Sequence, residues 1–363
     1  MSDSSKNKYD FVVIGSGASS LLTSSFLSQH SSKVLWLDSA TKSQQSDFSV
    51  ESFVKSHHID FIPYSDGMIS TLSSLFKGFQ LNLPEISFNE SQIKHYQNNQ
   101  WLDFVGFGES PPVYQSEISY FLAKQSLGSN ESFDELVRQA FERSQAERIN
   151  PAVVTKIQIE NETATSVIIN GQKAIEAEQF VFMTTPQDFI KCLPESFMSQ
   201  RSTNKIIKQK YLASINMEFK FETNIFENCN LRLITISESE GNYAIVGYPI
   251  ELKTQESLWT FFIQQDITED PEQLAAEVKK MKKAILKSLG FTEKDILKEK
   301  LVIKENAERL NDLRTDGMIQ IEKLQNVYLG SGLLNSAKNL NGMLNQFEIL
   351  IDKLGMHPEG HRV

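Results

Sequence analysis

The chain has 363 residues, of which 40% are hydrophobic and 23% charged, and its formal net charge is −10. These values are ordinary for a globular protein and exclude a fibrous or wholly disordered chain, while the length predicts two domains. The negative charge repels phosphate backbones, and the lysines from Lys279 to Lys300 are interleaved with acidic residues, so no nucleic-acid partner is expected.

The N-terminal region carries the signals of a βαβ unit. An apolar run from Tyr9 to Ile14 predicts a buried strand, and the spacing of apolar residues from Ala18 to Gln29 predicts a helix. A second buried strand is predicted from Lys33 to Leu37, and it ends at Asp38. Strand, helix and strand within about 30 residues predict a right-handed unit of a parallel sheet.

The middle of the chain contains the signals of a hairpin, a helix and a small antiparallel meander. Two asparagines lie at the expected turn of a hairpin from Lys94 to Trp101. Ser132 and Glu135 form a predicted capping box ahead of a helical stripe of apolar residues. Between Val153 and Met183 the apolar period becomes that of strands, with a turn predicted at Asn170-Gly171.

The last part of the chain predicts a second sheet and a return to the first. Asp270 as N-cap and Gly290 as terminator predict a helix between them. A short strand from Asn326 to Leu329 and a helix from Met343 to Ile351 are predicted near the C-terminus. The strands predicted for the second sheet are Lys208–Phe221, Leu231–Ile236, Tyr243–Tyr248 and Leu258–Ile263.

Together these elements predict an α/β protein. We expect a Rossmann-type FAD/NAD(P)-binding domain with a small antiparallel meander, plus a second α+β domain of the substrate type. Residues 1–85, 145–200 and 318–363 would form the dinucleotide-binding domain. Residues 86–144 and 201–317 would form the substrate or cap domain.

A glycine-rich hexapeptide lies where the first strand gives way to the helix, the context that a dinucleotide-binding fingerprint requires. Gly15 permits a tight turn, Gly17 lets backbone amides approach a pyrophosphate, and the helix N-terminus adds a partial positive charge. Ser20 stands where the fingerprint usually has its third glycine. The predicted diphosphate-binding residues are Gly15, Ser16, Gly17, Ala18, Ser19 and Ser20.

Asp38 ends the second strand, where a carboxylate can accept hydrogen bonds from ribose hydroxyls. An acidic residue there disfavours a 2′-phosphate, so NADP is the poorer ligand. The hexapeptide alone could be an unrelated Gly/Ser-rich turn, but strand, helix, strand and acid together favour dinucleotide binding.

The chain resembles the FAD-dependent amine oxidase and protoporphyrinogen oxidase family, as a divergent member. The resemblance implies that FAD is the cofactor and makes NAD less expected. It also implies an oxidoreductase that transfers a hydride from an apolar or amine substrate to flavin N5. It implies that backbone at Val154 faces adenine and that a helix start at Asn341, Gly342 and Met343 faces the flavin O2 edge, although Gly342 could equally begin a plain packing helix. The segments that carry the resemblance are Phe11–Asp38, Pro151–Pro186, Leu258–Leu289 and Asn326–Leu350.

The predicted cofactor-binding set is completed by residues at strand ends, namely Ser39, Thr185, Gly330, Ser331 and Gly332. Two departures from the family pattern concern this set. The segment 39–45 has no arginine or glycine, and Gly330-Ser331-Gly332 has no acidic residue. Both changes remove cofactor contacts, so a weak, altered or lost FAD site stays open.

These departures give a second hypothesis, a catalytically inactive FAD/NAD-binding-fold protein that acts as a binding or scaffolding module with a protein partner. A third and weaker hypothesis is an NAD-only dehydrogenase. No catalytic residue is identified, because His57, His58 and His95 lack partners at informative spacing. Lys210 and Tyr211 are at most candidates for contact with a small-molecule substrate.

Other features of the sequence concern metals and membranes. Cys192 and Cys229 lack the spacing of a disulfide framework or a zinc site, so no metal is predicted. The polar N-terminus lacks the apolar stretch of a signal peptide, and no run of about 18 apolar residues occurs. We therefore expect no integral membrane segment and a cytoplasmic location.

Overall fold

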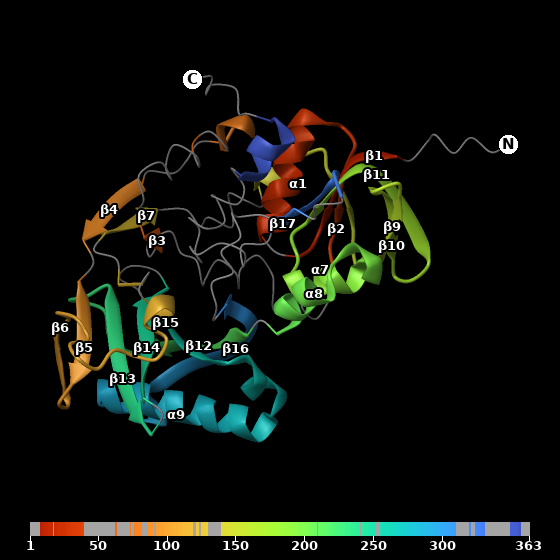
Figure 1. Ribbon diagram of the computed structural model, residues 1–363. Coiled ribbons are helices and arrows are strands. Elements are labelled where there is room, and N and C mark those ends of the chain that lie inside the picture. The colour runs from red at the N-terminus through yellow and green to blue at the C-terminus, as the bar shows by residue number, and fades with distance from the viewer. Residues whose placement is uncertain are drawn as a thin grey trace.

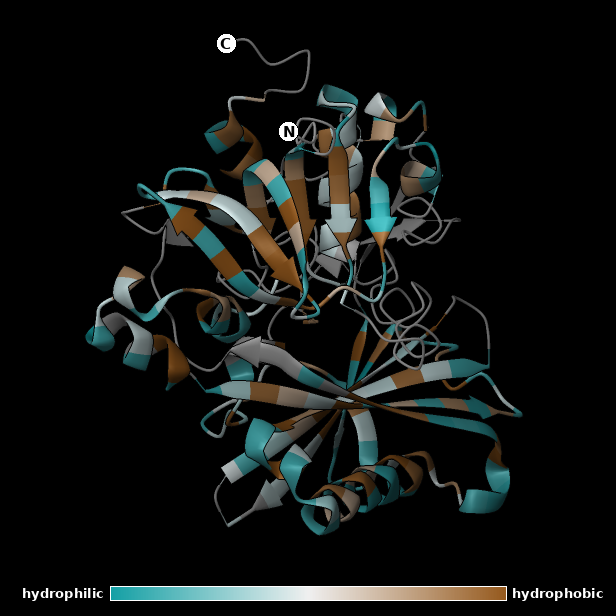
Figure 2. Cartoon of the chain, turned by 90° about the vertical axis from the view of Figure 1, so that its right-hand side faces the viewer, coloured by the Kyte–Doolittle hydropathy of each residue, from teal (hydrophilic) through white to brown (hydrophobic). Residues whose placement is uncertain are grey.

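A computed structural model shows a mixed α/β fold built around two large sheets (Figure 1), which confirms the predicted fold class. α9 covers the face of the second sheet that points away from the first sheet (Figures 1 and 2). The structure describes residues 8–16, 18–39, 62–63, 73, 76–81, 86–90, 92–118, 121–122, 125–129, 139–208, 210–239, 241–250, 255–309, 319–320, 324–330 and 349–356.

The first sheet is mainly parallel and follows the order β17-β18-β11-β1-β2-β8. The predicted βαβ unit is confirmed, because β1 lies parallel to β2 and the helix between them is α1 (Ala18–His30). β11 and β18 extend the sheet on the other side of β1 with parallel pairing, and β17 pairs antiparallel with β18 at the edge. The strands are β1 (Tyr9–Ile14), β2 (Val34–Leu37), β8 (Glu147–Ile149), β11 (Lys173–Phe182), β17 (Ile319–Gln320) and β18 (Val327–Leu329).

The predicted meander is confirmed as β9 (Val154–Glu160), β10 (Thr163–Ile169) and β11. Its second turn places Asn170 at φ 51° and Gly171 at φ 72°, the positive values that a tight hairpin turn requires. β11 takes part in both the meander and the parallel part of the sheet, because its first residues pair with β10 and its later residues pair with β1. The meander is therefore attached directly to the strand beside β1.

The inner strands β1 and β2 are largely apolar because both of their faces are covered. Val13 and Trp36 point to the side packed by α1, whereas Val12 and Leu35 point to the side packed by the meander. Figure 2 accordingly shows the inner strands of this sheet as mostly brown, whereas brown and teal alternate along α9. This double cover accounts for the continuous apolar runs in the sequence.

The second sheet follows the order β16-β12-β15-β14-β13-β5-β6. The predicted hairpin forms its β5–β6 end, with positive φ angles at Asn98 and Asn99. The predicted strands and hairpin are confirmed with small shifts in their bounds. The strands are β5 (Ile93–Gln97), β6 (Gln100–Asp103), β12 (Tyr211–Phe221), β13 (Leu231–Glu238), β14 (Gly241–Pro249), β15 (Glu256–Gln264) and β16 (Ile296–Arg309).

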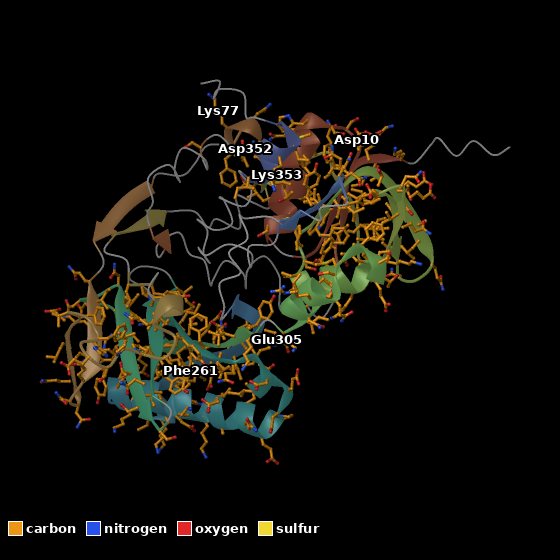
Figure 3. All side chains as sticks on the ribbon, viewed as in Figure 1. Asp10, Lys77, Phe261, Glu305, Asp352 and Lys353 are labelled. Atoms are coloured by element: carbon orange, nitrogen blue, oxygen red, sulfur yellow. The ribbon has the colours of Figure 1, made fainter. Side chains whose placement is uncertain are left out.

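The predicted helix after the second-sheet strands is confirmed as α9 (Pro271–Leu289). The Asp270 side chain accepts hydrogen bonds from the amides of Glu272 and Gln273, and Gly290 ends the helix at φ 70°. Phe261 projects from the sheet into the apolar layer beneath it, where Met281 is among the buried residues of α9 (Figure 3). Capping chemistry and an apolar stripe thus position this helix.

The remaining described elements are short. A third sheet follows the order β3-β7-β4. The helix with the predicted capping box at Ser132 begins outside the described residues, as does the helix predicted from Met343. In the described part of the chain, no helix is long and apolar enough to cross a bilayer. The short elements are β3 (Ile62–Pro63), β4 (Ile86–Glu90), β7 (Gln125–Ser129), α5 (Gln115–Ile118), α7 (Pro186–Cys192), α8 (Gln200–Ile207) and the 3-10 helices η3 (Glu195–Phe197), η4 (Gln265–Glu269) and η5 (Glu293–Asp295).

Candidate functional site

The carboxyl ends of the parallel strands meet at one edge of the first sheet. Gly15 follows β1, Asp38 follows β2, Met183 follows β11 and Gly330 follows β18. The chain leaves β1 through α1 toward β2 on one side, while β11 and β18 lie on the other side. Ligands bind to open α/β sheets at such a change of direction. The predicted site residues at these strand ends therefore converge on the edge where a ligand is expected.

The bend after β1 requires glycine at its first position. Gly15 has φ 140°, and a Cβ atom there would lie 2.8 Å from the Met183 carbonyl oxygen and 3.0 Å from Ser20 Oγ. Ser20 is fully buried, and its hydroxyl donates a long hydrogen bond of 3.4 Å to the Ser16 carbonyl. A serine in the third fingerprint position is therefore accommodated because it fills the space beside Gly15.

The start of α1 is suited to an anion. The first turn of the helix contains no acidic residue, so the helix does not itself place a carboxylate at the partial positive charge of its N-terminus. Ser16 is exposed and Ser19 half-buried. Gly17 lies outside the described residues. The described part of the bend thus combines an exposed hydroxyl with a helix start, and a diphosphate is one anion that this arrangement can bind.

Trp36 fastens β2 to the bend. Its indole Nε1 donates a 2.8 Å hydrogen bond to the Gly15 carbonyl, and its ring meets Phe141 edge-on at 5.3 Å between centroids. The guanidinium of Arg148 lies over the Trp36 ring, 4.6 Å from the ring centroid. Neither Trp36 nor Arg148 was identified from the sequence. The sequence did hold a signal for Trp36, because a tryptophan in a buried strand needs a hydrogen-bond acceptor for its indole N–H.

The carboxylate predicted to hold ribose is paired with an arginine. Asp38 is 2% exposed, and Arg148 Nη2 lies 2.5 Å from Asp38 Oδ2. The backbone of Asp38 is held as well, because its amide donates to the Ile149 carbonyl and its carbonyl accepts from the Ala152 amide. Asp38 is therefore fixed at the expected strand end, with its charge balanced by β8.

A hydroxyl pair joins the two sides of the predicted site. Ser16 Oγ and Ser39 Oγ lie 2.7 Å apart and share a hydrogen bond. Ser16 belongs to the bend after β1, and Ser39 follows Asp38 at the end of β2. The structure thus brings together two residues that were predicted to bind cofactor, and it connects them directly to each other.

The end of β11 carries one hydroxyl without a partner and one that caps a helix. Within the described part of the chain, the buried Thr184 Oγ1 has no hydrogen-bond partner. Thr185 is the N-cap of α7, where its Oγ1 accepts from the Asp188 amide at 3.1 Å and donates to the Asp188 carboxylate at 2.8 Å. Sequence reasoning missed Thr184. Its hydroxyl is positioned at this edge to form a hydrogen bond with a ligand.

Two more predicted residues have structural contacts. The Val154 carbonyl accepts a hydrogen bond from Cys192 Sγ at 3.3 Å. The Gly330 amide donates to the Phe182 carbonyl, and a Cβ atom at Gly330 would lie 2.9 Å from Met183 Sδ. The predicted residues that lie outside the described chain are Gly17, Ser331, Gly332, Asn341, Gly342 and Met343.

Two of the other candidate side chains, His95 and Tyr211, have hydrogen-bond partners in the structure. His95 is buried in the second sheet between Thr235 and Gln97, and burial lowers its pKa. Tyr211 donates a hydrogen bond to Gln187. Burial raises the pKa of the Cys192 thiol to about 11. His57 and His58 are among the residues that the structure leaves undescribed, and its described residues include no cluster of three His, Cys, Asp or Glu residues suited to a metal ion.

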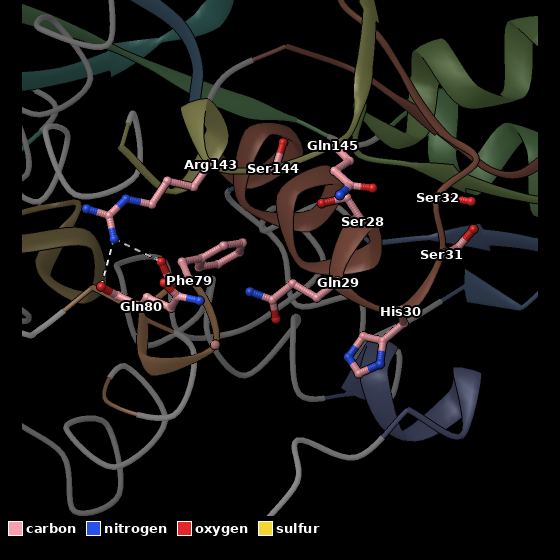
Figure 4. Close-up of a pocket in the computed structure, with 11 residues that line it drawn as sticks. Ser28, Gln29, His30, Ser31, Ser32, Phe79, Gln80, Arg143, Ser144 and Gln145 are labelled. Atoms are coloured by element: carbon pink, nitrogen blue, oxygen red, sulfur yellow. Dashed lines mark hydrogen bonds between the residues drawn. The ribbon is translucent and has the colours of Figure 1, made fainter.

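A cavity of about 840 Å³ lies at the end of α1, away from the predicted site (Figure 4). Its walls include Ser28, His30 and Ser144. Arg143 Nη1 donates hydrogen bonds to the carbonyls of Phe79 at 3.1 Å and Gln80 at 2.7 Å, which Figure 4 marks with dashed lines. The predicted cofactor-binding residues that the structure describes do not border this cavity.

Comparisons with known proteins give structural neighbours only. No protein-family model matches the sequence, and no curated protein matches it. An oxidoreductase from Methanosarcina mazei superposes with a TM-score of 0.61 at 10% identity, over 94% of this chain and 99% of that chain. A putrescine oxidase double mutant with redesigned cofactor binding superposes at 0.60 and 9% identity, over 96% of this chain and 99% of that chain.

A third neighbour is the glycerol-3-phosphate dehydrogenase from Bacillus halodurans, complexed with FAD. It superposes with a TM-score of 0.53 at 12% identity over 97% of this chain, which spans only 66% of the length of that protein. Such low identities establish a shared fold. The fold of this chain is therefore one that FAD-containing oxidoreductases also use, in agreement with the Rossmann-type fold predicted from the sequence.

Proposed function

We propose that the chain is an FAD-dependent oxidoreductase of the amine oxidase-like class. The observation that carries this proposal is the bend after β1, where Gly15, exposed Ser16 and the acid-free start of α1 lie at the topological switch point of a parallel sheet. In this proposal the bend binds the diphosphate of FAD, and Asp38 with Ser39 faces the adenosine sugar. NAD is the less favoured ligand.

The residues present fit the diphosphate end of FAD better than its sugar end. Thr184 adds a buried hydroxyl that has no hydrogen-bond partner among the described residues, next to Met183, whose carbonyl would lie 2.8 Å from a Cβ at Gly15. At the sugar end, Arg148 already contacts the Asp38 carboxylate. The remaining proposed contacts are those predicted from the resemblance, at Val154, Thr185, Gly330, Ser331, Gly332, Asn341, Gly342 and Met343.

The proposed substrate is an apolar or amine compound that gives a hydride to flavin N5, a step whose chemistry the flavin supplies. The second sheet supports this class because the face opposite α9, which points toward the first sheet (Figure 1), is apolar, and the side chains of Tyr114, Ile118 and Phe121 pack on it. Tyr248 and Phe121 stack on this face at 5.8 Å between centroids. In this proposal residues 86–144 and 201–317 form the substrate domain and residues 1–85, 145–200 and 318–363 the FAD domain, in a cytoplasmic enzyme.

A second candidate function is an inactive binding or scaffolding module with the same fold. It is favoured by one observation, that side chains of the chain itself occupy the sugar end of the site. Asp38 is paired with Arg148, and Ser16 is hydrogen-bonded to Ser39. Such a module would bind a protein partner and would lack a reducible chromophore.

The test begins with the absorbance spectrum of the purified protein and with calorimetric titration of the full chain with FAD and with NAD. Bound FAD that dithionite bleaches supports the first function. A folded, colourless protein that takes up no added FAD excludes it and leaves the scaffolding function.

A charge variant then tests the location of the site. Ser16→Glu places a carboxylate at the exposed bend, where it repels a diphosphate but suits the N-terminus of α1. Ser16→Gln is the matched control, because it has the same length without the charge and loses the same hydrogen bond to Ser39. We expect FAD affinity to fall in Ser16→Glu relative to Ser16→Gln. Equal affinities in the two variants would place the diphosphate elsewhere.

A further inference from the structure

The arginine beside the proposed sugar position is held in place by its neighbours. Arg148 lies directly opposite Trp36 in the parallel pairing of β8 with β2. Its guanidinium lies 4.6 Å from the centre of the Trp36 ring. Trp36 is itself fixed, through its hydrogen bond to Gly15 and its edge contact with Phe141. The Arg148 guanidinium therefore has a defined position, and its side chain loses little conformational entropy when it pairs with the Asp38 carboxylate.

The ion pair is unequally exposed. The Asp38 side chain is 3% exposed, whereas the Arg148 side chain is 39% exposed. A group that approaches from solvent therefore meets the guanidinium before it meets the carboxylate. Because ribose hydroxyls must donate to the carboxylate, the sugar needs the space and the acceptor that Arg148 now uses.

We propose that Arg148 is a specificity-determining residue of the nucleotide site, which competes with ribose for Asp38 and so lowers the affinity for FAD. This inference rests on the proposed function, because it takes the bend after β1 as the nucleotide site. The competitor is part of the chain and must move before the sugar can bind. Ser39, the next residue after Asp38, is in turn hydrogen-bonded to Ser16 of the bend.

The substitution that tests this idea keeps a hydrogen bond but removes the charge. In Arg148→Gln, a neutral amide can still donate to Asp38, so the buried carboxylate is not left without a donor. A charge-assisted hydrogen bond is roughly twice as strong as a neutral one. The sugar then displaces a weaker competitor, and we expect FAD to bind about tenfold tighter than to the unsubstituted chain.

Arg143→Gln is the matched control, since it removes the same charge at a position whose guanidinium contacts the carbonyls of Phe79 and Gln80 instead. The assay is calorimetric titration of the full chain with FAD, with circular dichroism and thermal unfolding to confirm that each variant is folded. Tighter binding in Arg148→Gln and unchanged binding in Arg143→Gln supports the inference.

Arg148→Lys is a second variant, which keeps the positive charge but loses the planar guanidinium. It tests the inference if Arg148→Gln does not fold. We expect its affinity to lie between those of the unsubstituted chain and the neutral variant. Unchanged or weaker FAD binding by a folded Arg148 variant overturns the inference while the proposed function stands. Absence of FAD binding by the unsubstituted chain and by every folded variant overturns both.

Discussion

Gly15→Ala is the sharpest perturbation of the bend that carries the proposed site. The added Cβ would lie 2.8 Å from the Met183 carbonyl oxygen and 2.9 Å from its carbonyl carbon, both of them backbone atoms. Met183 cannot retreat easily, because its amide donates a 2.7 Å hydrogen bond to the Ile14 carbonyl. In addition, φ 140° is a backbone angle that alanine rarely adopts.

Two costs therefore add in this variant. A residue forced into a sparsely populated backbone region costs about 1–3 kcal/mol, and overpacking of a buried contact costs about 1–3 kcal/mol. We expect the free energy of unfolding to fall by about 4 kcal/mol. Gly171→Ala is the matched control, because Gly171 also has positive φ, at 72°, but has nothing within 4 Å of its added Cβ. Its expected loss is about 1–2 kcal/mol.

The assay is urea denaturation followed by tryptophan fluorescence. Of the three tryptophans, Trp36 donates its indole N–H to the Gly15 carbonyl, so its share of the emission reports the bend. A loss in Gly15→Ala no larger than the loss in Gly171→Ala would refute the reasoning, because it would mean that Met183 does not constrain the bend. The proposed diphosphate site would then have no rigid support on the side of β11.

Three further outcomes are expected. Trp36→Phe leaves the buried Gly15 carbonyl without its indole donor, so chemical denaturation should show a loss of about 2 kcal/mol, and an unchanged midpoint would contradict the role given to the indole. Asp270→Ala removes the cap of α9 and should cost about 1 kcal/mol, whereas Asp270→Asn should cost less. Burial lowers the pKa of His95, so below about pH 6.5 the unfolded state binds more protons than the folded state. The thermal midpoint of unfolding should therefore fall as the pH drops through that range. The fall should be smaller in His95→Gln.

Local chemistry explains the elements that sequence patterns predicted well. A turn with two positive φ angles selects Asn170 and Gly171, and an orphan pair of helix amides selects Asp270. These requirements are met by residues adjacent in the chain, so their signal is visible in the sequence. The continuous apolar runs of β1 and β2 were equally clear because both faces of the first sheet are buried.

β16 was missed because its signal is not local. Its 14 residues from Ile296 to Arg309 are rich in lysine and glutamate, as befits a strand at the edge of a sheet. Leu297 and Leu301 are 55% and 44% exposed, so no clean alternation of apolar and polar residues marks a buried face. The strand forms because β12 offers a long unpaired edge, which a reading of residues 296–309 alone does not reveal.

The candidate site shows the same division between local and distant causes. The position of Asp38 at the end of β2 followed from the βαβ pattern, but its partner Arg148 is far away in the chain and reaches it only through the pairing of β2 with β8. β8 has only three residues, too few for a periodic signal. For Thr185 a signal was present, since Thr185-Pro186 followed by Asp188 is a helix-start pattern, and the structure uses this threonine as a cap.

The two proposed functions diverge at the sugar end of the site. The proposed diphosphate end is made largely of backbone, so a protein that no longer binds a cofactor could keep Gly15, because a Cβ there would meet Met183 and Ser20. The proposed sugar end depends on a single carboxylate, and one arginine is enough to engage it. The presence of the bend therefore does not separate an enzyme from a scaffold. The exchange of Arg148 for ribose at Asp38 does separate them, because only a protein that binds the nucleotide gains affinity when that competitor is weakened.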